Sequence, residues 1–219
     1  MTQITMKQIK EEGEVYLEDE FKIIYLTPSE PLTYHMNKWK YKVLPTINQW
    51  YSDIEKQWEM HKRQQSSHLA FTFPENMTPN VTWLEAIRNK GFQLGLFELY
   101  AIESDILKQF NKNSHVDIEP VTKNNMEDYL NIYNEFSKPY GEMFVKENEL
   151  RTKKAILNGE DNINRIVAYY CQEPVGILDA IVTNDTIEID GFGVIETYQH
   201  RGIGTTMQSY VGAVSYTHL

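Results

Sequence analysis

The sequence predicts an α+β fold with a mixed sheet, and three observations support this prediction. Short segments in which apolar and polar residues alternate recur along the 219-residue chain, as expected of half-buried strands. Between them lie segments whose apolar residues recur every three or four positions, which is typical of amphipathic helices. A glycine-bearing strand pattern at 186–194 then leads through a second glycine pair into a last helical pattern. We therefore expect one large or two small domains, with enough chain to bury a core.

Composition and charge disfavour several classes of partner. The formal net charge is −10 and the isoelectric point is near 5.1, which disfavours nucleic acid and acidic membrane surfaces. Cys171 is the only cysteine, so the chain cannot form an internal disulfide, and a reducing compartment is expected. The N-terminal residues lack the apolar core of a signal peptide, and no apolar run is long enough to span a membrane. The sequence therefore predicts a cytoplasmic protein with no membrane partner.

The first half is expected to contain short strands and two helical regions, with one break at Pro45 inside the longer helical pattern. The predicted elements are two strands within 14–26, a loop at 27–31, a broken helix over 34–65, a buried strand at 68–73, a helix at 83–90 capped by Thr82, and a strand at 96–102.

The longer helix of this half carries one apolar face that we expect to lie in the core. His61 and His68 are seven residues apart and have no acidic or cysteine partner at ligand spacing, so no metal site is assigned. Residues 105–114 are polar with a helical start, and we expect them to connect two domains, 1–112 and 113–219. The residues of the apolar face are Ile47, Trp50, Ile54, Trp58 and His61.

The second half repeats the mixture of strands and helices. Asn158 and Gly159 are expected to close its second helix, because glycine accepts the left-handed conformation of a C-cap. The predicted elements are a strand at 116–121, a helix at 124–136 with Met126, Leu130, Tyr133 and Phe136 on one side, a break at 137–141, a helix at 142–157, strands at 165–171 and 175–183 joined by the turn Gln172–Pro174, and a turn at Asn184–Asp185.

The strand pattern from Thr186 places Ile187 and Ile189 on one face. It places Glu188, Asp190, Phe192 and Val194 on the other. The two glycines inside it, Gly191 and Gly193, predict a bulge or a place where another group approaches the backbone closely.

The turn that follows this strand opens a helix. A helix N-terminus offers backbone N–H groups and a partial positive charge to an anion such as phosphate. Gly202 and Gly204 have no side chain to hold a ligand away from these groups. A tight turn without any ligand is the alternative interpretation.

The pattern Gln199-x-x-Gly202-x-Gly204, with Val194 five positions upstream, resembles the acyl-CoA-binding motif of the GNAT superfamily of N-acetyltransferases. A dinucleotide fingerprint fits less well, because Met207 stands where its third glycine belongs. The resemblance implies an acetyl-CoA site in which a strand backbone binds the pantetheine arm and thioester carbonyl, and the glycine turn wraps the pyrophosphate. The implied residues are Phe192, Gly193 and Val194 on the strand, and Gln199, His200, Arg201, Gly202, Ile203, Gly204 and Thr205 on the turn.

The resemblance covers residues from about Val116 to Ala213 and includes the order of elements as well as the motif. It implies a GNAT-like fold that would continue with another strand, a helix and two more strands, so we expect the second copy to be truncated after the CoA-binding helix and prone to aggregation. The tail from Val214 to Leu219 does not continue the helical face. The first half is either a degenerate copy of the same fold or an unrelated α+β domain.

The implied activity is that of an acyltransferase that moves the acetyl group of acetyl-CoA to an amine on a small molecule or peptide. No catalytic residue is assigned. Glu188 and Asp190 are the nearest carboxylates and are either a base acting through water or ordinary strand residues. A non-catalytic acyl-CoA-binding or interaction module is the alternative, and an aminoacyl or peptidyl transferase is a third reading that the acidic charge disfavours.

Overall fold

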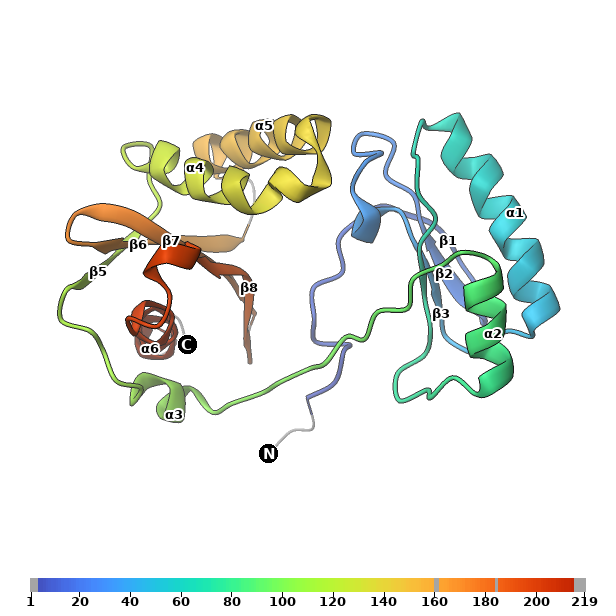
Figure 1. The fold of residues 1–219 in the computed structure, drawn as a ribbon, viewed down its shortest axis with the longest axis horizontal. Helices are drawn as coiled ribbons and strands as arrows, with labels where there is room; N and C mark the ends of the chain where they lie inside the picture. The colour runs from blue at the N-terminus through green and yellow to red at the C-terminus, as the bar shows by residue number, and fades with distance from the viewer. Residues whose placement is uncertain (1–3, 160–161, 184, 215–219) are drawn as a thin grey trace. The chain divides into compact units, whose positions relative to one another are not determined.

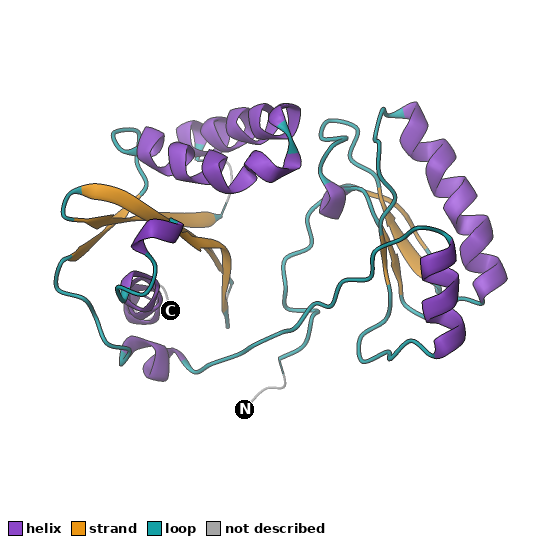
Figure 2. Cartoon of the chain, viewed as in Figure 1, coloured by secondary structure: helices purple, strands orange, loops and turns teal. Residues whose placement is uncertain are grey.

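A computed structural model describes residues 4–159, 162–183 and 185–214 (Figure 1). The chain divides into two compact units. The N-terminal unit comprises residues 11–99, and the C-terminal unit comprises residues 4–10 and the described residues from 100 onward. Each unit combines helices with a sheet of its own (Figure 2), so the predicted α+β fold class is confirmed.

The N-terminal unit contains a four-stranded sheet in the order β1-β2-β3-β4. Its first three strands are antiparallel and the last runs parallel to β3. The helices α1 and α2 share one apolar cluster with the sheet, built around Trp50 and Trp83. The elements are β1 (Val15–Glu18), β2 (Lys22–Tyr25), the 3-10 turn η1 (Tyr34–Met36), β3 (Trp39–Tyr41), α1 (Ile47–Arg63), β4 (Phe71–Thr72) and α2 (Val81–Asn89).

Part of the helical pattern predicted for 34–65 is wrong. The residues before Pro45 form η1 and β3, and only the later residues form a helix. Trp39 pairs with Ile24 of β2 on one side and with Phe71 of β4 on the other, and it is 2% exposed. Pairing with two neighbouring strands overrides the local helical pattern, and a strand of three residues is too short to show a period of its own.

The buried face of α1 also differs from the prediction. Trp58, expected in the core, is 48% exposed, whereas Gln57 is fully buried. The Gln57 amide donates to the carbonyl of Ala70 and accepts from its N–H, both at 2.9 Å. Satisfying both backbone groups makes a buried glutamine stable, and a hydrophobic pattern cannot reveal this.

Two smaller predictions in this part of the chain are also wrong. Asn80, not Thr82, caps α2, because its Oδ1 accepts from Trp83 N at 3.0 Å. Residues 96–102 form no strand within the described chain, and Leu96 and Phe97 are 84% and 79% exposed. No described strand pairs with this segment, and an alternating pattern alone does not supply a partner.

His61 and His68 lie inside the N-terminal unit, with ring centroids 5.1 Å apart. His61 Nδ1 lies 2.7 Å from the carbonyl oxygen of His68. Burial lowers the pKa of His61, and burial together with the neighbouring His61 lowers the pKa of His68 to about 4. Both rings are therefore neutral at pH 7. Among the described residues, no cluster of three or more His, Cys, Asp or Glu side chains is arranged to hold a metal ion.

The C-terminal unit contains an antiparallel sheet in the order β5-β6-β7-β8. Helices α4 and α5 lie over one face, and α6 and α3 lie at the other (Figure 1). The elements are α3 (Ser104–Lys108), β5 (Val116–Pro120), α4 (Met126–Ser137), η2 (Lys138–Tyr140), α5 (Glu142–Asn158), β6 (Ile163–Tyr170), β7 (Glu173–Val182), β8 (Ile187–Val194), η3 (Glu196–Tyr198) and α6 (Ile203–Val214).

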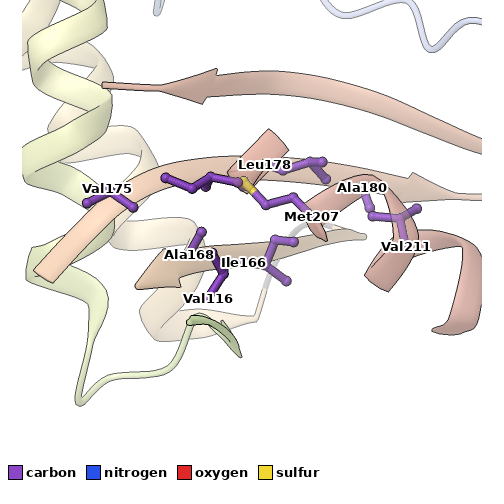
Figure 3. Close-up of a cluster of buried hydrophobic side chains, with 9 residues drawn as sticks. Val116, Ile166, Ala168, Val175, Leu178, Ala180, Met207 and Val211 are labelled. Atoms are coloured by element: carbon purple, nitrogen blue, oxygen red, sulfur yellow. The ribbon is translucent and has the colours of Figure 1, made fainter. Parts of the chain in front are cut away.

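Alternation along the central strands separates two apolar layers. Val167 and Ile177 are fully buried against α4. The alternate residues of the same strands, including Ala168 and Leu178, point to the opposite face and pack against Met207 of α6 (Figure 3). The sheet is therefore buried on both faces, which fixes the register of its strands.

Details of the connections test the remaining predictions. Gly159 ends α5 with φ 65°, which confirms the predicted C-cap. The hairpin between β6 and β7 turns at Cys171 and Gln172, whose φ values are positive, so the turn predicted at Gln172–Pro174 lies earlier in the chain. Asn184 and the tail after Val214 lie outside the described residues.

The segment 105–114 is more than a connection. Its helix α3 packs on α6, where Ser209 Oγ donates to the Lys108 carbonyl at 2.9 Å. A Cβ added to Gly212 would lie 2.6 Å from the Lys108 backbone N. Gly212 therefore permits the close approach of the two helices. In the described part of the chain, no helix is both long enough and apolar enough to cross a membrane.

Candidate functional site

The predicted bulge is present in β8. Ile177 of β7 pairs with Gly193 of β8, and Asp179 pairs with Asp190. β8 therefore has one more residue than β7 between these two pairs. Gly191, at the bulge, has φ 54°, a left-handed conformation that glycine adopts without strain.

The bulge reverses the alternation of β8. Val194 packs against the same apolar cluster as Ile187 and Ile189, on the α6 side. Phe192 also points toward α6, because a Cβ on Gly204 would meet its Cζ at 3.1 Å. The predicted grouping of Phe192 and Val194 with Asp190 on one face is therefore wrong. An inserted residue shifts every later side chain to the opposite face of the sheet.

A cavity of about 440 Å³ lies between the end of β8 and the start of α6. The residues predicted for the acyl-CoA site all line this cavity except Arg201, and Tyr198 is an additional lining residue that sequence reasoning missed. The lining residues are Phe192, Gly193, Val194, Tyr198, Gln199, His200, Gly202, Ile203, Gly204 and Thr205.

The start of α6 presents a run of backbone donors. Among the described residues, the N–H groups from His200 through Thr205 have no hydrogen-bond acceptor, and the first helical bond is donated by Thr206 to the Gly202 carbonyl at 3.0 Å. His200 and Gly202 have φ values of 60° and 73°. Free donors beside the positive end of a twelve-residue helix are suited to binding an anion.

The turn is held by side chains from outside the motif as well as inside it. Asn113, which the sequence did not single out, donates from Nδ2 to the Arg201 carbonyl at 2.7 Å and from its backbone N to Thr206 Oγ1 at 2.9 Å. Thr206 Oγ1 in turn donates to the Gly202 carbonyl at 2.8 Å. These bonds occupy carbonyl groups and leave the N–H groups free.

Gln199 connects the turn to the strand. Its Nε2 donates to the Val194 carbonyl at 3.0 Å. Ile195 N donates to the Val175 carbonyl at 2.9 Å, so by the alternation of an antiparallel ladder the backbone of Val194 faces away from β7. The N–H of Val194 therefore points to the outer edge of β8, where it can meet a ligand that lies along the strand.

The side chain of Arg201 is held outside the cavity. Its guanidinium carbon lies 5.6 Å and 5.4 Å from the ring centroids of Tyr170 and Tyr198, and Nη2 donates to the Thr197 carbonyl at 3.3 Å. Cation–π contacts of this kind fix a loop while keeping the charge partly solvated. Arg201 is thus the predicted residue that does not line the cavity, and its contacts fix the shape of the turn.

The two candidate carboxylates lie elsewhere. Asp190 is directly opposite Asp179 on the α4 side of the sheet, and Glu188 accepts from the Lys10 N–H at 2.8 Å. No Asp, Glu or Cys side chain from the described chain lines the cavity. The site is therefore built from backbone groups and polar or aromatic side chains, with the His200 imidazole and no carboxylate among the described lining residues.

Comparison with protein families gives two matches. Residues 4–100 match a domain of unknown function, DUF5613, and residues 129–211 match the acetyltransferase (GNAT) family. No curated protein matches the chain.

Among solved structures, a conserved protein of unknown function from Staphylococcus epidermidis is 46% identical. The match covers 97% of this chain and 83% of that chain, with a TM-score of 0.91. The PaiA N-acetyltransferase from Thermoplasma acidophilum in complex with coenzyme A is 14% identical over 47% of this chain and 72% of that chain, with a TM-score of 0.39.

The chain belongs to the same family as the Staphylococcus protein, and its second half is a GNAT acetyltransferase domain. That relative has no known function, so its name assigns no activity to this chain.

Proposed function

We propose that the C-terminal unit binds acetyl-CoA in the cavity between β8 and α6 and transfers the acetyl group to an amine. The supporting observation is the run of backbone N–H groups, His200 through Thr205, that find no acceptor among the described residues. Hydrogen bonds to a charged acceptor contribute about 1.5–3 kcal/mol each, so several of them gripping a diphosphate account for tight binding.

The open edge of β8 suits the rest of the cofactor. β8 ends the described sheet, with β7 as its pairing partner. An extended pantetheine arm carries amide groups that can pair with an exposed strand edge as another strand would. Its thioester carbonyl then lies near the outward N–H of Val194, which supplies a hydrogen bond as negative charge develops on the oxygen.

In the proposed reaction the neutral amine nitrogen attacks the thioester carbon. The C–S bond breaks and CoA leaves as a thiolate, which takes up the proton that the attacking nitrogen loses, so the products are the acetylated amine and CoA thiol. Alkylamines have pKa values near 10, so the acceptor must lose a proton before it attacks. The cavity lining offers no carboxylate for this step. Water or a group on the acceptor is the proposed route for that proton.

The first test is binding. Acetyl-CoA is titrated into the protein in a calorimeter, and inorganic pyrophosphate is added as a competitor. We expect saturable heat, competition by pyrophosphate, and loss of affinity in Gly204→Val, whose side chain would meet Phe192 and Val194 inside the cavity. Gly95→Val is the matched control, because a Cβ at Gly95 meets nothing within 4 Å. No heat with millimolar acetyl-CoA would refute the proposal.

The second test separates an enzyme from a binding module. Release of free CoA thiol is measured with a panel of primary amines and a thiol reagent, in a Cys171→Ser background because Cys171 is exposed and would react. Thiol release that depends on both acetyl-CoA and amine supports transfer. Binding of acetyl-CoA without release for any amine, including peptide N-termini, favours the non-catalytic alternative.

A further inference from the structure

A buried carboxylate lies beneath the bulge of β8. Asp179 on β7 is 9% exposed, and its Oδ1 accepts a hydrogen bond from the Tyr129 hydroxyl at 2.7 Å. Arg165 Nε lies 3.7 Å from the other carboxylate oxygen. Tyr129 is fully buried on α4. Burying a charged group is costly unless it is paired, and here the Tyr129 hydroxyl and Arg165 supply the pairing.

Gly191 lies against this carboxylate. A Cβ built on Gly191 would lie 3.2 Å from Asp179 Cγ and 3.3 Å from Oδ2. The carboxylate thus packs against the face of the glycine where a side chain would point. Asp179 also pairs with Asp190, the last residue of β8 before the register shifts. Carboxylate and bulge therefore meet at the same point of the sheet.

The bulge decides which side chains reach the cavity. Without the extra residue, strict alternation would place Phe192 and Val194 on the α4 face and Gly193 on the α6 face. With it, Phe192 and Val194 line the cavity, and Gly193 faces the ring of Phe136, which a Cβ built at position 193 would meet. Loss of the bulge would therefore dismantle the strand side of the cavity.

We propose that Tyr129 and Asp179 are positioning residues that lock the bulge of β8 and thereby hold Phe192 and Val194 in the acyl-CoA cavity. This role rests on the proposed function, because the bulge matters for binding only if the cavity binds acyl-CoA. The Tyr129 hydroxyl fixes the Asp179 carboxylate, and the carboxylate occupies the space into which a side chain at position 191 would point. Burial and the adjacent Asp179 raise the pKa of Tyr129, so its hydroxyl remains a donor at physiological pH.

The test compares two tyrosines that each donate to a carboxylate. Tyr129→Phe removes the bond to Asp179, and Tyr169→Phe removes the bond from Tyr169 to Asp128, which is also 2.7 Å long but lies on β6. Amide hydrogen exchange is followed in ligand-free protein, and the acetyl-CoA Kd is measured in parallel. For Tyr129→Phe we expect exchange to quicken in the peptide 188–194 and Kd to rise about tenfold, which corresponds to about 1.4 kcal/mol. Tyr169→Phe should leave both at wild-type values.

Gly191→Ala is the second variant and reports what a disrupted bulge looks like, because alanine is strained at a φ of 54° and its methyl group would also lie against the carboxylate; it should produce the same local exchange change. Exchange in 188–194 that stays at the wild-type rate in Tyr129→Phe would overturn the inference, whatever Gly191→Ala shows. So would exchange that quickens equally across the whole C-terminal unit, because that pattern indicates only lost stability. Failure of the wild-type protein to bind acetyl-CoA would instead refute the proposed function, since the exchange experiment uses no ligand.

Discussion

Gly202 allows the proposed phosphate-binding turn to be tested through backbone geometry alone. Its φ of 73° is left-handed, and a Cβ added there would meet only Asn113 Cβ at 3.7 Å, an ordinary contact. A substitution therefore costs conformational strain and causes no clash within the protein. For an L-residue this strain is about 1–2 kcal/mol, which the turn can relieve by rotating out of the left-handed region. That rotation would turn the following N–H groups away from the ligand.

Two substitutions separate strain from bulk. Valine is branched at Cβ and tolerates the left-handed region poorly, whereas asparagine adopts it several times more often than most residues. If the full strain appears in binding, Gly202→Val should raise the acetyl-CoA Kd about 5- to 30-fold. Gly202→Asn should raise it by less than about threefold on the same scale, because most of the strain is absent.

The assay is calorimetric titration with acetyl-CoA, with far-UV circular dichroism melts to confirm that both variants are folded. Equal losses in the two variants would show that side-chain bulk against the ligand matters, and would refute the argument from φ. Wild-type affinity in Gly202→Val would remove the turn from the binding site altogether.

Three further outcomes are expected. The N-terminal unit should lose stability in acid, because the buried His68, with a pKa of about 4, is neutral in the folded protein and takes up a proton on unfolding below pH 6.5. Its contribution of about 3 kcal/mol to the free energy of unfolding is complete above pH 6.5 and is lost as the pH falls toward 4. Urea melts followed by tryptophan fluorescence will measure this loss, since all four tryptophans lie in this unit. Arg201→Gln should weaken acetyl-CoA binding by only about 0.5–1 kcal/mol, which is the energy expected of the lost cation–π contacts with two tyrosine rings. A loss of affinity that disappears at high salt would instead indicate a direct contact between Arg201 and a phosphate. Gly212→Ala should destabilise the C-terminal unit by about 1–3 kcal/mol in urea melts, because its methyl group would meet the Lys108 backbone; an unchanged midpoint would contradict this packing.

The sequence predicted best where local chemistry decides the structure. The order of strands and helices from β5 to α6 agrees with the pattern, and the glycine turn at Gly202 lies beside Gly204 and Val194 in one cavity. These elements depend on hydrophobic period, glycine spacing and caps, which neighbouring residues specify.

The sequence-based predictions failed where residues far away in the sequence determine the local structure. β3 forms within a predicted helix because β2 and β4 flank it, and 96–102 forms no strand in the described chain because nothing there pairs with it. Asn113 supports the turn from 88 residues away, at Arg201, so no local pattern could identify it. Tyr198 lines the cavity although it stands outside the glycine motif, so the motif could not identify it.

The sequence by itself determined that a strand ends in a glycine turn whose N–H groups, from His200 onward, begin a helix. The geometry of any helix start leaves four of these groups free, from Gly202 through Thr205, so no tertiary contact is needed to predict them. Only the tertiary structure decided which face of β8 serves that turn. The choice depends on one inserted residue at Gly191, and that insertion is packed against Asp179, a carboxylate from the neighbouring strand.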